Sequence, residues 1–192
     1  MACQTLTLGR KEQCLTSSGG LKAVYFINQD EASTYDSFTV DANDQIVTFG
    51  TPLESDGVTA DPISLFKYEL KSFASSFEQS NETSREQGTS VFTQTATIVL
   101  RVQDAATQKE MYSLATSNSS AIVQDQNDNY FYLGKVNGLI SSVSSATGAA
   151  LADQNGYTIT LEGTETKPAD FVLADIIGDA AGETESVIVE GV

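Results

Sequence analysis

The residue types that most often do chemistry in proteins are scarce in this chain. Its 192 residues include no His and no Trp, and its only two thiols belong to Cys3 and Cys14. Without His, the chain lacks the commonest general base and the commonest metal ligand. The composition therefore argues against most hydrolases and against zinc sites, and we expect no catalytic residues, no cofactor and no bound metal.

The spacing of Cys3 and Cys14 is neither that of a redox CxxC pair nor that of a zinc knuckle. Two interpretations stay open for these thiols. They are either two independent cysteines or a disulfide that forms late and staples the N-terminal arm, residues 1–20.

Oxygen ligands and paired carboxylates give no specific signal either. Asp125, Asn127 and Asn129 fall at alternate positions, as in a calcium loop, but the following Gly and the distal Glu of an EF-hand are missing. We therefore predict a turn at residues 125–129. Pairs of Asp and Glu can hydrolyse glycosides, yet nothing in the sequence selects two of them, so an enzyme remains only the third alternative.

The charge of the chain is strongly negative. Its 26 acidic and 10 basic residues give a formal net charge of −16, which argues against a nucleic-acid-binding surface because phosphate contacts need clustered Lys and Arg. No apolar run reaches the length of a membrane span, and the N-terminus lacks the apolar core of a signal peptide. We expect one domain, residues 1–192, that is made and assembled in a cytosol without a membrane partner.

Two extended segments dominate the middle of the chain. Residues 65–71 and 91–102 alternate apolar and polar side chains with the two-residue period of a half-buried strand. The polar side of the second segment is rich in Thr, which suits a pleated surface that faces solvent. Between them the apolar parity switches near residues 71–73, and this indicates a bulge or a sharp bend.

These segments predict one long bent hairpin. Its arms run from residue 65 to about residue 82 and from residue 86 to residue 102, with the turn in residues 81–85; the alternative is a disordered loop at residues 72–90. A helix follows, for which Asp104 is the expected N-cap. Met111, Leu114 and Ala115 form a short apolar stripe that must dock on the sheet.

Shorter strands complete a mainly β fold. We expect them at residues 21–27, 38–40, 45–49, 121–124, 130–134, 136–143 and 157–161, with a last apolar segment at residues 171–177. The first of these is apolar on both sides, as in a central strand or one at an interface. Residues 50–64 read as a surface loop. Residues 178–192 read as an acidic tail, in which residues 187–189 could add an edge strand.

The order of strand, long hairpin, helix, hairpin and strand resembles that of the tail tube proteins of tailed bacteriophages and the related inner-tube proteins of contractile injection systems. Several local strings look like those of tail structural proteins from marine and related phages. They are MACQTLTLGRKEQC, SSGGLKAVYF, FKYELKSFASSFEQSNETSREQGTSVFTQTATIVL, DAATQKEMYSLA, DQNDNYFYLG and DQNGYTITLEGTETKPADFV. Together they span residues 1–173, without the 50–64 loop and the acidic tail.

The resemblance implies a β-sandwich subunit with one flanking helix, docked through Met111 and Leu114. The long hairpins of neighbouring subunits would form a continuous inner barrel in a ring, usually of six, and stacked rings would form the tube. DNA would pass through it without specific binding, along a lumen near Glu78, Glu82, Arg85 and Glu86. The family has no catalytic pattern to transfer.

From this resemblance we expect a structural virion protein that is a tail tube subunit and not an enzyme. Its partners would be other copies of itself and, in the virion, sheath, baseplate and tail terminator proteins. One alternative is a tube-like ring at the neck or baseplate. Another is a cell-surface, sugar-binding β-sandwich adhesin, suggested by Tyr130, Tyr132 and Tyr157 but weakened by the missing signal peptide and Trp platform.

Overall fold

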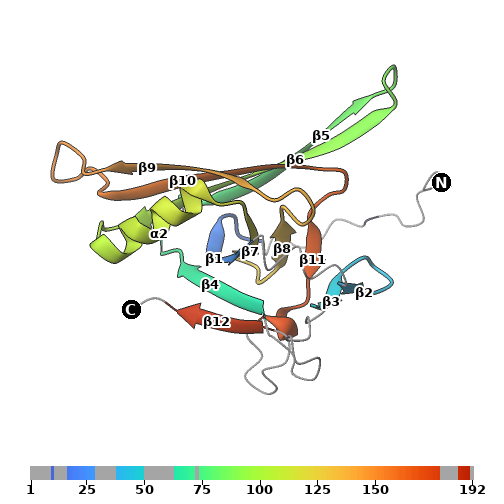
Figure 1. Ribbon diagram of the computed structural model, residues 1–192, viewed down its shortest axis with the longest axis horizontal. Coiled ribbons are helices and arrows are strands. Elements are labelled where there is room, and N and C mark those ends of the chain that lie inside the picture. The colour runs from blue at the N-terminus through green and yellow to red at the C-terminus, as the bar shows by residue number, and fades with distance from the viewer. Residues whose placement is uncertain are drawn as a thin grey trace.

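The computed structural model describes residues 10, 17–28, 38–49, 63–71, 74–177 and 186–190. These residues are mainly β, as predicted, with a single α-helix among them (Figure 1). The strands are β1 Leu21–Asn28, β2 Thr39–Val40, β3 Ile46–Thr48, β4 Ile63–Glu69, β5 Ser76–Ser84, β6 Thr89–Arg101, β7 Ser119–Asp125, β8 Tyr130–Leu133, β9 Ile140–Ala146, β10 Gly156–Glu165, β11 Asp170–Val172 and β12 Ser186–Glu190. The helix is α2, Ala105–Thr116, and the 3-10 turn η1 is Ala174–Ile176.

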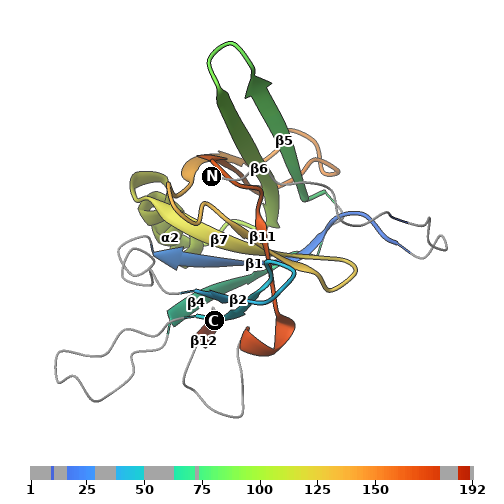
Figure 2. The ribbon, with the colours of Figure 1, turned by 90° about the vertical axis from the view of Figure 1, so that its right-hand side faces the viewer.

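The strands form two sheets of different size. The large sheet has the order β12-β4-β1-β7-β8-β11-β3-β2 and the small sheet the order β5-β6-β10-β9. The large sheet curls into a half-barrel, and the small sheet runs along one side of it (Figure 1). Figure 2 shows the β5–β6 hairpin projecting well beyond the rest of the molecule.

A shared core joins the small sheet, the large sheet and the helix. Its buried residues include Ala96 and Ile98 of β6, Val24 of β1, and Met111 and Leu114 of α2. The predicted docking of the helix through Met111 and Leu114 is therefore confirmed, whereas Ala115 is exposed. The Asp104 carboxylate accepts a hydrogen bond from the Thr107 backbone N–H, which confirms the predicted N-cap.

The large sheet is buried on both faces where β1 crosses its middle. On the face away from the small sheet, Tyr25 and Ile27 of β1 pack with Leu65 of β4, Ile122 of β7 and Tyr132 of β8. The strand pairs with β4 on one side and β7 on the other. It is thus a central strand, as its apolar residues on both sides indicate.

A long hairpin is present, but it consists of β5 and β6 and its turn lies later in the chain than predicted. β5 and β6 pair without interruption from Ser76↔Thr97 to Ser84↔Thr89, so the alternative of a disordered loop is wrong for residues 74–90. The turn lies at residues 85–88, where Gly88 has a φ of 67°, and not at residues 81–85. The prediction put the turn too early because polar residues 81–84 look like a turn yet still pair with β6.

Only the beginning of the predicted first arm, residues 65–69, belongs to the other sheet. β4 pairs with β1, from Ala23↔Glu69 to Phe26↔Phe66, and makes no ladder with β6. The chain passes from the large sheet to the small one between Glu69 and Ser76. The parity switch therefore marks a change of sheet, while residues 72–73, where we placed a bend, lie outside the described residues.

Two other predicted boundaries also need correction. β9 begins at Ile140 and not at residue 136, because the backbone N–H groups of Val136 and Asn137 bind the Glu165 carboxylate instead of a neighbouring strand. The apolar segment at residues 171–177, for which no element was predicted, contains the end of β11 and then η1. Residues 63 and 64 belong to β4 and not to the preceding loop.

The acidic tail contributes an edge strand, as its apolar residues suggested. β12 pairs in parallel with β4, and the Lys67 ammonium lies 3.0 Å from the Glu190 carboxylate across the pair. At the other terminus, Cys3, Cys14 and most of the predicted N-terminal arm lie outside the described residues. Both interpretations of Cys3 and Cys14, as independent cysteines or as a disulfide, therefore stay open.

Candidate functional site

One face of the small sheet has no other element packed on it in the described residues. Alternate residues of its four strands point away from the shared core and carry mainly hydroxyl groups. We call this surface the hydroxyl face. Its polar residues are Ser76, Glu78, Ser80, Glu82, Thr93, Thr95, Thr97, Ser142, Ser144, Thr158, Thr160, Glu162 and Thr164, and the same side of the sheet also carries Val91, Val99, Arg101 and Ile140. A face so rich in Thr and Ser is too polar for a second core and too regular for a loop.

The two-residue period of each strand produces this face. In β6, Gln94, Ala96 and Ile98 are buried, while the Thr residues between them are half-exposed. The register places Glu78 and Glu162 on either side of Thr95, so the two carboxylates and the threonine form one row across the sheet. Thr residues suit such a surface because their branched side chains pack well on a half-exposed pleat.

The sequence analysis predicted only part of the hydroxyl face. Glu78 and Glu82, predicted to face a lumen, do lie on it, whereas Arg85 and Glu86 lie in the exposed turn between β5 and β6. Sequence reasoning missed Glu162 and the Thr residues of β10. The alternation of Thr and Glu in GYTITLEGTE was the available signal, but it did not show that β10 lies beside β6.

The small sheet has two edges that no described strand covers. β5 is one edge strand and β9 is the other, with nine and seven residues. β9 contains no charged residue and no Pro, whereas β5 contains no Lys or Pro but carries Glu78 and Glu82; natural proteins place charged residues and Pro on edge strands to prevent pairing with another chain. Since every neighbouring pair in this sheet is antiparallel, β5 and β9 run in opposite directions.

Buried polar side chains fix the orientation of the small sheet on the large one. The buried Gln94 side-chain oxygen accepts a hydrogen bond from the Gly134 backbone N–H at 3.0 Å. The buried Glu165 carboxylate accepts from the backbone N–H groups of Val136 and Asn137 at 2.9 and 2.8 Å. These contacts hold the sheet from its inner side and leave the hydroxyl face open.

The loop between β7 and β8 is a turn, as predicted. The Asp125 carboxylate accepts hydrogen bonds from the backbone and side-chain amides of Asn127 and Asn129. Burial by itself would raise the pKa of Asp125, but these hydrogen bonds outweigh it and hold the pKa below its ordinary value of 3.8. Within the described residues, no group of three or more His, Cys, Asp or Glu is placed to hold a metal ion.

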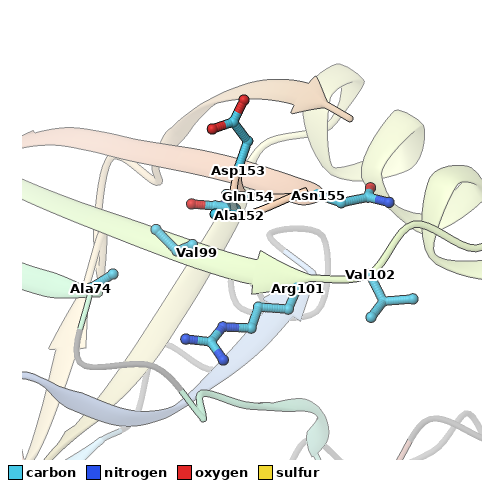
Figure 3. A pocket seen from close by; sticks show the side chains of 8 residues that line it. All are labelled: Ala74, Val99, Arg101, Val102, Ala152, Asp153, Gln154 and Asn155. Carbon is cyan, nitrogen blue, oxygen red and sulfur yellow. The ribbon is translucent and has the colours of Figure 1, made fainter. Parts of the chain in front are cut away.

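A cavity of about 480 Å³ lies at the end of the small sheet where β6 finishes. Its lining residues are Ala74, Val99, Arg101, Val102, Ala152, Asp153, Gln154 and Asn155 (Figure 3). The Asp153 carboxylate accepts hydrogen bonds from the backbone N–H groups of Ala149 and Ala150, which shape the loop between β9 and β10. No nucleophile paired with a general base lines this cavity.

The known proteins offer no match to this chain: no family model, no curated protein and no solved structure is similar to it. No helix among the described residues is long and apolar enough to cross a membrane.

Proposed function

We propose that this chain is a structural virion protein, the subunit of a phage tail tube, whose small sheets join edge to edge into a closed ring. The hydroxyl face would line the channel of that ring, and DNA would pass through the channel during ejection. The main observation in support is a four-stranded antiparallel sheet with two uncovered edges and a polar face turned away from the core.

The directions of the two edge strands favour this mode of assembly. Because β5 and β9 run in opposite directions, β9 of one copy can pair antiparallel with β5 of the next, and the sheet then continues with the same alternation. Repetition around an axis closes the ring and removes every edge of the small sheets. Exposed edges that would otherwise promote aggregation become the assembly contact.

The size of such a barrel suits a channel. Barrels of eight strands are filled by their own side chains, whereas barrels of 16–18 strands enclose water. A ring of six copies, as the resemblance implies, would have about 24 strands, because each copy supplies four. The wall of so wide a barrel must be polar, which accounts for a Thr- and Ser-rich surface opposite a well-packed core.

The large sheet and α2 would form the outer wall of this ring. In this proposal the two sheets of each copy form a β-sandwich around their shared core, and the large sheet faces away from the channel. Sheath, baseplate and tail terminator proteins would bind the outer wall or the ends of the tube. Assembly would take place in the host cytoplasm, and a ring at the neck or baseplate would use the same contacts.

The tyrosines that suggested a sugar-binding adhesin are poorly placed for that role. Tyr132 and Tyr157 are 1% and 3% exposed, so neither ring can stack on a sugar. Tyr130 is half-buried and packs against Tyr25, with ring centroids 6.3 Å apart. These positions favour the structural role over the adhesin.

Electron microscopy and light scattering of the purified protein test this proposal. We expect rings or tubes from the wild type, and single subunits from a Ser142→Lys/Ser144→Lys variant, because Lys on an edge strand opposes pairing. Both substituted side chains are exposed, so the fold should persist. The matched control, Thr158→Lys/Thr160→Lys, adds the same charge to the same face on an inner strand and should still form rings. A wild type that stays monomeric at high concentration would refute the proposal.

A further inference from the structure

The cavity at the end of β6 contains a cation without a partner among the described residues. The Arg101 guanidinium has no carboxylate within ion-pair distance there. The nearby Asp153 carboxylate is already bound to two backbone N–H groups, and Figure 3 shows it turned away from Arg101. A guanidinium carries five donors in a planar fork that fits a carboxylate, so the cavity has an unused site for an acidic group.

Strained and exposed apolar residues flank this cation. Val102, a β-branched residue, has a φ of 67° and is 68% exposed, and its backbone N–H donates to the Asn155 carbonyl at 2.9 Å. Such a conformation costs about 1–3 kcal/mol and is typical of functional positions. Leu151, in the adjacent loop, is fully exposed. The end of the sheet thus presents apolar side chains beside an unpaired charge, as a contact surface does.

The opposite end of the same strand carries a complementary group. β6 runs from Thr89 to Arg101, and the turn at residues 85–88 precedes it. Glu86, in that turn, is exposed and has no ion-pair partner among the described residues. The turn projects from the body of the molecule, so it can reach another copy (Figure 2). The turn also carries Arg85 and is therefore neutral overall, so the Glu86 carboxylate is the one group in it that can bind the Arg101 guanidinium in a head-to-tail contact.

We infer that the cavity receives the β5–β6 turn of a second copy, with the Glu86 carboxylate bound to the Arg101 guanidinium and Val102 and Leu151 packed against the incoming strands. This inference rests on the proposed function, because it describes how one ring binds the next. A head-to-tail contact leaves a free end at each step and therefore builds an open tube. The thirteen residues of β6 span about 40 Å at the usual rise of a strand, and the tilt of strands in a closed barrel reduces this to about 30–35 Å along the tube axis.

Charge reversal at both ends tests the contact. We expect Arg101→Glu and Glu86→Arg, each alone, to form rings that no longer stack, and to raise the protein concentration needed for tubes about tenfold or more. The double variant Arg101→Glu/Glu86→Arg restores the opposite charges and should form tubes again. Lys109→Glu and Glu110→Arg are the controls, since they make the same charge changes on the exposed side of α2 and should leave tubes unchanged.

Electron microscopy and sedimentation separate this inference from the proposed function. Wild-type tubes from either single variant, or a double variant that stays as rings, would overturn the inference and leave ring formation intact. A wild type without rings or tubes would overturn both. If a single variant proves unstable by circular dichroism, the milder pair Arg101→Gln and Glu86→Gln gives the decision: both should lose stacking, and normal tubes from both would refute the contact.

Discussion

The Asp125 carboxylate determines the conformation of the turn between β7 and β8. Its two oxygens accept four hydrogen bonds from Asn127 and Asn129, at 2.8 to 3.2 Å, and close the turn between β7 and β8. The residues that resemble calcium ligands in the sequence thus bind one another. Their alternate spacing reflects a turn, in which a side chain caps backbone groups two and four positions ahead.

We predict that Asp125→Ala lowers the free energy of unfolding by about 1 kcal/mol at neutral pH, a modest loss because water still screens this partly exposed carboxylate. Folding lowers the pKa of Asp125, so its stabilising effect is complete above the unfolded-state pKa, near 3.8. That effect disappears as the pH falls through the lower folded-state pKa. Urea unfolding across this pH range should show the wild type and the variant converging in acid. A difference that persists in acid would contradict the assignment, and Glu110→Ala, at an exposed helix position, is the control.

A second prediction for a single residue concerns Met111. It is 3% exposed and packs in the core that joins α2 to both sheets. Met111→Asp should lower the free energy of unfolding by about 3 kcal/mol or more, because the new carboxylate has no partner there. Tyr112→Asp adds the same charge one position along, where the side chain is 73% exposed, and should change stability by no more than about 0.5 kcal/mol. Similar melting temperatures for the two variants would show that the helix is not docked as described.

At the scale of elements, the sequence predicted the strands and the helix, because these elements depend on residues that are close together along the chain. The period of residues 91–102 indicates a strand, and Asp104 with the Met111 and Leu114 stripe indicates a capped helix, because these signals are local. The partner of each strand is not a local property. β4 and β5 are consecutive and both alternate, yet they belong to different sheets. The hydroxyl face was therefore predicted only for the part that β5 and β6 supply.

The β5–β6 hairpin gives a prediction at this scale. Replacing residues 83–90 with Asn-Gly removes the turn and two strand pairs, and leaves Glu82↔Val91 to be closed by a two-residue turn. The subunit should keep its fold, since nearly all the deleted residues are exposed. The remaining part of β5, residues 76–82, still matches the length of β9, so rings should form. Tubes should not form, because the projecting turn that would contact the next ring has been removed. Circular dichroism and electron microscopy check both statements, and wild-type tubes would contradict them.

At the scale of the whole molecule, the charges are distributed unevenly. The formal net charge is −16, yet the hydroxyl face carries only Glu78, Glu82 and Glu162, with Arg101 at its end. Most of the negative charge therefore lies elsewhere. A channel lined by this face would offer DNA hydroxyl groups and scattered carboxylates but few cations. Because binding of DNA depends on cations that displace its counterions, such a wall should let a duplex slide without being held.

The row formed by Glu78, Thr95 and Glu162 allows this idea to be tested. Closure of the ring would repeat the row around the channel at one level, so Glu162→Lys would add a belt of cations at that level. We predict that this variant still forms tubes, because the Glu162 side chain is exposed and β10 is not an edge strand, but that its tubes retain duplex DNA and particles carrying it eject DNA slowly. Retention should weaken steeply as salt is added, since each phosphate contact releases counterions. The control Glu110→Lys makes the same charge change at an exposed position outside the hydroxyl face, and its tubes should not retain DNA in the channel. Ejection at the wild-type rate in low salt, where phosphate attraction is strongest, would show that the hydroxyl face does not line the path of the DNA.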